Sequence, residues 1–248
     1  MIINVARKEL KSLFASPMGW IILALLMLAF GSFYLQGVNN YFEVMSGSIR
    51  PAERVGVTIF VGQTVYGIAS FLMLFAVPLL TMRLISEERK SQTLPFLFSA
   101  PISLTEIVVG KFLGLIIFLS ILVLYILLML STLNIWSDID FGYLIANSLG
   151  LILLAASFSA LGIYFSSLTN QPIIAGILSF IALFALMGLD KFFASQPNHW
   201  FGYISLMKHF QSFSRGVIDS KDIVYFILFI TTFLVLTIRR LDSDRLRG

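Results

Sequence analysis

A short run of charges interrupts the apolar chain at residues 86–101, which read SEERKSQTLPFLFSAP. The four charged residues follow one another in the order acid, acid, base, base: Glu87, Glu88, Arg89 and Lys90. Together with the preceding Arg83, this order predicts a solvated turn of helix. Charges of both signs in such density suit contact with another protein, because complementary charges fix the register of a bound partner.

The residues that follow the charges predict a second short helix with an apolar face. Thr93 can cap this helix, which would begin at Leu94 and end at Pro101. Leu97 and Phe98 would share its apolar face with Leu94. Apolar side chains displayed on a loop predict a partner that covers them. The alternative is that they lie back in a membrane interface.

The sequence offers no catalytic apparatus and no metal site. The chain has no cysteine, and its two histidines, His199 and His209, fit no metal-binding spacing. Gly110 and Lys111 lack the earlier glycine of a phosphate-binding loop. Lys111 and the nearby Glu106 are expected to snorkel to the membrane interface. We therefore predict a protein that is not itself an enzyme.

Composition indicates that lipid surrounds these elements. The 248 residues are 58% hydrophobic and only 12% charged, and a water-soluble domain cannot hide so much apolar surface. The predicted fold class is therefore an all-α integral membrane protein. A span needs about 20 apolar residues, and charge-free runs place six transmembrane helices. They are expected at residues 17–36, 58–82, 104–131, 143–168, 173–189 and 223–238.

Most of the 17 Lys and Arg residues fall on the side of the membrane that holds both termini. The positive-inside rule then predicts that both termini and residues 86–101 are cytoplasmic. The first apolar run is longer than the core of a signal peptide, so an uncleaved helix is favoured over a cleaved leader.

Two further segments are expected to lie on the membrane surface. Residues 1–16 predict an amphipathic interface helix with a basic face, turned to lipid headgroups or to a cytoplasmic partner. Its basic residues are Arg7, Lys8 and Lys11. Residues 190–222 are rich in Phe and predict short re-entrant or interfacial helices on the outer side. Ser220 is expected to cap the last span.

These features together resemble the ABC-2-type transporter permeases, over essentially the whole chain. The stretch RLISEERKSQTLPFLFSAPISLTEIVVGKFLG is similar to the most recognisable segment of that family, which contains a coupling helix between the second and third spans. The matching residues are Glu87, Glu88, Arg89, Thr93, Leu94, Pro101, Gly110 and Lys111. Gln92 and Pro95 stand where glycine and glutamate are common, which alters the fine contact with a partner. The stretch KHFQSFSRGVIDSKDIVYF resembles the gliding-motility-associated subgroup.

The resemblance implies that residues 1–248 form a single transmembrane domain of the bacterial inner membrane. It would pair with a second permease copy or a homologue, and residues 86–101 would dock on a cytoplasmic ABC ATPase, which binds the ATP and Mg. The chain itself would bind no cofactor and no nucleic acid. The resemblance implies an exporter; the alternative is an anchor that transmits force and moves no substrate. An auxiliary membrane subunit with a large extracytoplasmic domain is a further expected partner.

A membrane enzyme, such as a lipid-modifying transferase, is the competing class. It needs a polar or acidic cluster at an interface, and the sequence shows only scattered polar loop residues. The cargo of a transporter is not indicated by any residue of the chain.

Overall fold

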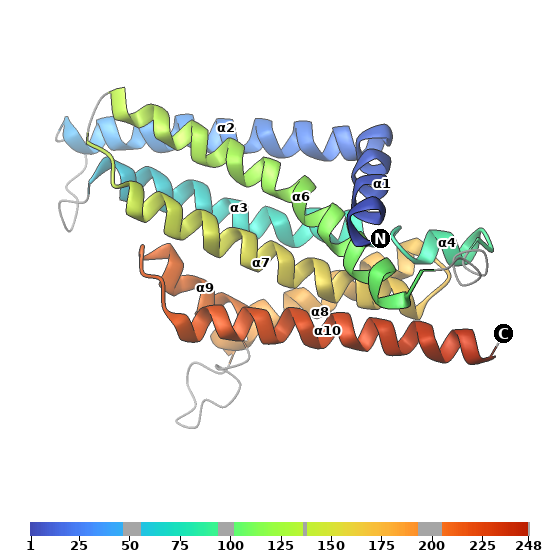
Figure 1. Cartoon of the computed structure of the whole chain (residues 1–248). Coiled ribbons are helices and arrows are strands. Elements are labelled where there is room, and N and C mark those ends of the chain that lie inside the picture. The colour runs from blue at the N-terminus through green and yellow to red at the C-terminus, as the bar shows by residue number, and fades with distance from the viewer. Residues whose placement is uncertain (47–55, 94–101, 136–137, 193–204, 248) are drawn as a thin grey trace.

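The computed structural model describes residues 1–46, 56–93, 102–135, 138–192 and 205–247 (Figure 1). Within this part of the chain every regular element is a helix, which confirms the predicted all-α class. In chain order they are α1 (Ile2–Ala15), α2 (Pro17–Met45), α3 (Val57–Thr81), α4 (Ser86–Lys90), α6 (Leu104–Ser131), a 3-10 turn (Thr132–Ile135), α7 (Phe141–Leu168), α8 (Pro172–Phe192), α9 (Leu206–Ser214) and α10 (Ser220–Arg247).

Among the described residues, five helices are long and apolar enough to cross a membrane: α2, α3, α6, α7 and α10. The expected fifth span lies in α8, whose apolar part, Pro172–Gly188, is shorter than the others. The count of six spans therefore stays a prediction. Two helices run further than expected, since α2 continues to Met45 and α10 continues to Arg247. Polar residues end an apolar run, but Arg, Gln and Glu are good helix formers and do not end a helix.

Helix α7 forms the centre of the bundle, with α3, α6 and α10 packed around it (Figure 1). Within its apolar stretch of 18 residues, 78% of the residues are buried, against 28% for the corresponding stretch of α2 and 22% for that of α10. Small residues let the neighbours approach closely. A Cβ at Gly150 would lie 2.5 Å from the Cβ of Phe213 on α9, and one at Gly162 would overlap Thr81 on α3. The peripheral α2 and α10 keep apolar side chains exposed, as a lipid-facing helix does.

The polar residues within the bundle join α7 to α3. The Tyr66 hydroxyl donates to the Leu144 carbonyl at 3.2 Å and lies 2.7 Å from the Ser148 hydroxyl. Asn147 is fully buried, and its amide donates to the Tyr143 carbonyl of its own helix at 2.9 Å. An asparagine within a span commonly bonds to a neighbouring helix. Here the hydrogen bond to α3 is made by the next residue, Ser148, and Asn147 bonds within α7.

The two termini lie at the same end of the bundle, together with α1 and α4 (Figure 1). Helix α9 lies at the opposite end and buries Leu206, Phe210 and Phe213. It belongs to the expected segment 190–222, of which residues 193–204 lie outside the described part. Asp219, rather than the expected Ser220, caps α10, because its carboxylate accepts the Lys221 amide hydrogen at 3.0 Å.

Candidate functional site

The short helix α4 is held in place by the last turn of α7. The Ser166 hydroxyl accepts the amide hydrogens of Ile85 and Ser86, each at 3.1 Å, and donates to the Met82 carbonyl at 3.1 Å. One side chain of α7 therefore satisfies the backbone groups at the turn between α3 and α4. No local pattern points to this serine, because its partners lie about eighty residues away in the sequence.

A hydrogen-bonded turn at residues 91–93 ends α4. The Thr93 hydroxyl donates to the Glu88 carbonyl at 3.1 Å, and the Ser91 hydroxyl donates to the Glu87 carbonyl at 2.8 Å. Gln92 adopts a φ of 57°, in the left-handed region that favours glycine. This conformation explains why glycine is common here in the family that the chain resembles. Of the second predicted helix, Leu94, Leu97, Phe98 and Pro101 lie outside the described residues.

The four charges of α4 divide into two pairs with different surroundings. Glu87 and Lys90 are exposed, and neither side chain forms an ion pair within the described residues. Glu88 and Arg89 are half-buried and point back to the bundle: Glu88 bonds Lys111 on α6, and Arg89 forms an ion pair with Asp244 on α10. Glu87 and Lys90 thus remain available to a partner, whereas Glu88 and Arg89 anchor the helix.

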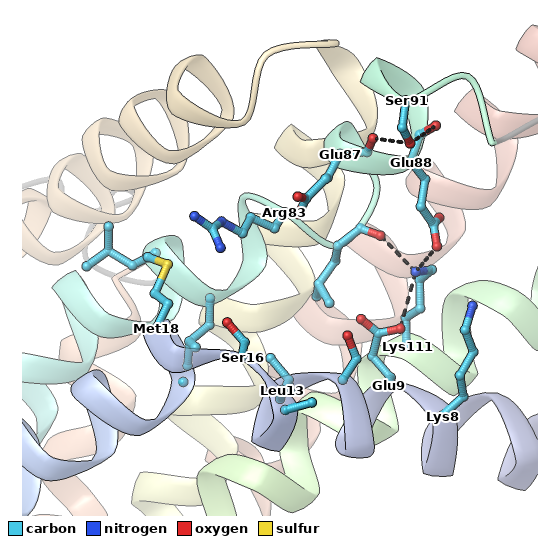
Figure 2. Close-up of a pocket in the computed structure, with 16 residues that line it drawn as sticks. Lys8, Glu9, Leu13, Ser16, Met18, Arg83, Glu87, Glu88, Ser91 and Lys111 are labelled. Atoms are coloured by element: carbon cyan, nitrogen blue, oxygen red, sulfur yellow. Dashed lines mark hydrogen bonds and ion pairs between the residues drawn. The ribbon is translucent and has the colours of Figure 1, made fainter.

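Lys111 on α6 connects this helix to both α4 and α1 (Figure 2). Its ammonium donates to the Leu84 carbonyl at 2.8 Å, to Glu88 Oε1 at 2.7 Å and to Glu9 Oε2 at 3.4 Å. The side chain is only 3% exposed, so the prediction that it snorkels to the interface is wrong. An ammonium has three hydrogens, and each finds an acceptor here, which offsets the cost of taking the charge out of water.

Helix α1 lies across the first turns of α6 at two glycines. A Cβ at Gly110 would come within 2.6 Å of the Val5 side chain, and one at Gly114 within 2.8 Å of the Ala6 carbonyl. The spacing of these glycines allows the two backbones to approach closely. This contact brings Glu9 of α1 to Lys111.

The basic residues expected on the surface of α1 lie on its free side. Arg7, Lys8 and Lys11 are all exposed. At the start of α6, Ser103 and Glu106 form a reciprocal capping box, as the expected start of the third span requires.

A pocket of about 440 Å³ opens beside Lys111 (Figure 2). It lies between α1, the turn into α2, the C-terminal end of α3, and α4. Its charged lining includes Lys8, Arg83 and Glu87, and its apolar wall includes Leu79 and Leu80. Among the described residues no group of three or more His, Asp or Glu could hold a metal ion.

The predicted site residues thus fall into four groups. Glu87, Lys90, Arg7, Lys8 and Lys11 are exposed, and Glu88 and Arg89 are bound within the chain. Thr93 closes the turn after α4, and residues 94–101 lie outside the description. Reasoning from the sequence missed the internal partners Glu9, Ser166 and Asp244. For Lys111, the available signal in the sequence was the Gly110–Lys111 pair in the early turns of the third span.

A comparison with protein families places these features in context. The family model described as ABC-2 family transporter protein matches residues 3–244 of the chain. No curated protein shows significant similarity to it.

Proposed function

Because the chain belongs to the ABC-2 family of transporter proteins, it is a membrane permease subunit of an ABC transporter, and we propose that it forms half of an exporter. A separate cytoplasmic ATPase would supply the energy and bind α4 together with the residues that follow it. Both termini and α4 would face the cytoplasm, across six spans. The observation that carries this proposal is the division of the α4 charges into an exposed pair and an anchored pair.

The anchored pair explains how a push on α4 would reach the spans. Glu88 connects α4 to Lys111 on α6, and through Lys111 to Glu9 on α1. Arg89 connects the same helix to Asp244 on α10. A partner that displaces α4 would therefore move α1, α6 and α10 together instead of bending a loop. Such rigid-body movement is a common way to open a path across a membrane.

The exposed pair would set the register of the ATPase. Glu87 and Lys90 are three residues apart, so they share one face of the helix, opposite in charge and one turn from each other. An ATPase surface with the complementary pair of charges fits this face. A second permease copy would pack against the exposed apolar side of α2, where Ile21, Leu25 and Leu28 are more than half exposed.

The experiment is co-purification of the chain with its ATPase. Glu87→Lys and Lys90→Glu should each lower the retained ATPase several-fold, since each places a repulsive charge at the contact. Glu43→Lys, an equal charge change on the exposed far end of α2, is the matched control and should leave retention unchanged. Equal retention in all three variants would refute docking through α4.

A second measurement separates the exporter from an anchor that moves no substrate. An exporter in liposomes should show ATP hydrolysis that rises with its cargo, whereas an anchor that shares the docking helix should not. ATP hydrolysis that does not rise with cargo would favour the alternative, a gliding-motility-like anchor with an auxiliary extracytoplasmic subunit.

A further inference from the structure

The free face of α1 concentrates positive charge that nothing in the described chain neutralises. Asn4, Arg7, Lys8 and Lys11 follow one another at intervals that place them on one side of a helix. They line an open pocket of about 410 Å³. All four are exposed, and none of the three bases forms an ion pair within the described residues. The nearest acid in the sequence, Glu9, is already bound to Lys111.

Apolar residues beside this face indicate that a membrane covers it. Ile3 on α1 is 80% exposed, and Trp20, in the first turns of α2, is 57% exposed. The Trp20 indole donates to the Phe14 carbonyl at 2.7 Å, which fixes the turn between α1 and α2. Phe14 in turn packs edge-on against Phe118 of α6, deeper in the bundle. Helix α1 therefore packs its apolar side on α6 and turns its bases outward, with Ile3 exposed beside them, as in interfacial helices.

We propose that Asn4, Arg7, Lys8 and Lys11 form a binding site for the phosphate groups of anionic phospholipids. The three cations offer only hydrogen-bond donors, and the NH2 group of Asn4 adds two more, which match phosphate oxygens. An acidic surface of the ATPase would satisfy the same charges. The position of α1 directly before a membrane-spanning helix, with Ile3 and Trp20 exposed beside the bases, favours lipid.

The site adjoins the ion pairs that hold α4. Lys8 lines both the lipid-binding pocket and the pocket beside Lys111, and Glu9 is its neighbour in sequence. A headgroup bound to the outer side of α1 would press its inner side onto Gly110 and Gly114 of α6. Anionic lipid would in this way stabilise the position of α1 from which Glu9 reaches Lys111. Lipid binding itself depends on no assumption about transport or cargo.

The test uses Trp20 as a reporter in the full-length chain without any ATPase. Replacing the other two tryptophans, Trp136→Phe and Trp200→Phe, leaves Trp20 as the one indole. The protein is placed in phosphatidylcholine vesicles that contain a brominated lipid, either phosphatidylglycerol or phosphatidylcholine, at the same fraction. Quenching of Trp20 should be clearly stronger with phosphatidylglycerol.

Two double variants of the single-tryptophan protein test whether the bases of α1 cause the preference for phosphatidylglycerol. Each base near a membrane surface is worth roughly five-fold in relative lipid binding, so Arg7→Gln with Lys11→Gln should lower the preference by about 25-fold. Arg239→Gln with Arg245→Gln removes two exposed bases from the same expected side and should leave the preference unchanged. Because the first variant could fold poorly, the unmodified protein is also measured at high salt, which should abolish most of the preference.

Several results would overturn the proposal. Equal quenching by both lipids in the unmodified protein would show that no anionic lipid binds at α1. A preference that survives Arg7→Gln with Lys11→Gln, or survives high salt, would place the lipid elsewhere. Competition by soluble glycerol 3-phosphate at millimolar concentration would indicate a site for free phosphoesters instead of a lipid surface. If neither lipid is preferred without the ATPase and added ATPase protects Trp20 from both quenchers, the basic face would be assigned to a protein contact.

Discussion

Lys111→Met tests the role of the buried ammonium that joins three helices. The substitution keeps most of the aliphatic stem and removes only the charge. It leaves Glu9, Glu88 and the Leu84 carbonyl without their shared donor, although these two carboxylates are 12% and 19% exposed. Breaking a fully buried pair costs about 3–5 kcal/mol, and partial hydration of the carboxylates lowers this to roughly 2–3 kcal/mol.

The assay is thermal unfolding of the purified chain in detergent. For a chain of this size each 1 kcal/mol lowers the Tm by roughly 2–4 °C, so Lys111→Met should lower it by about 4–12 °C. In liposomes with the ATPase, the same variant should hydrolyse ATP with little transport, because α4 would move without α1 and α6.

The control removes the stranded charges as well. Glu9→Gln and Glu88→Gln combined with Lys111→Met leave no uncompensated charge, and the triple variant should recover much of the lost Tm. A Tm for Lys111→Met within one or two degrees of the unmodified chain would refute the reasoning. A triple variant no more stable than the single one would do so too.

Three further substitutions test the geometry around this centre. Gly114→Val should displace α1, because a Cβ there meets the Ala6 carbonyl, and trypsin should then cut α1 faster; Gly67→Val, whose Cβ would meet nothing within 4 Å, is the control and should leave cleavage unchanged. Gln92→Gly should stabilise the chain by about 1 kcal/mol, seen as a higher Tm, whereas Gln92→Ala should not, because only glycine relieves a φ of 57°. Arg89→Gln should lower the Tm, and Asp244→Asn should lower it somewhat more, because Asp244 also pairs with Arg240. The two losses should not add in full in the double variant, since both break the Arg89–Asp244 pair, and additive losses would contradict that pairing.

The helices could be predicted because the membrane imposes a simple rule on the sequence. A span must be long and free of charge, so the gaps between charged residues locate α3, α6 and α7 closely. Ser103 followed by Glu106 is a capping box that can be read directly from the sequence, and α6 begins at Leu104. The ends of α2 and α10 could not be found this way, because nothing in their polar residues stops a helix.

The site could be predicted only in part. Periodicity shows which residues share a face of a helix, and it placed Arg7, Lys8 and Lys11 correctly on the exposed side of α1. It does not show which distant residue a charge will meet. Lys111 pairs with Glu9 across 102 positions of the sequence, and Arg89 pairs with Asp244 across 155. Charges in a row were therefore interpreted as a solvated turn although two of the four point inward.

The order of the charges in α4 fits the docking role that we propose for this helix. Successive residues of a helix turn by about 100°, so Glu87 and Lys90 return to one face while Glu88 and Arg89 point to other sides. Glu88 meets α6 and Arg89 meets α10, which fixes the helix on two flanks. A single turn of helix could not remain folded by itself, and a partner that pulled on it would unwind it. The anchored pair therefore holds α4 in the position from which the exposed pair can contact a partner. Substitutions should separate the anchoring role from the contact role. Glu87→Lys should weaken ATPase binding at an unchanged Tm, while Lys111→Met should lower the Tm and uncouple ATP hydrolysis from transport with the ATPase still bound.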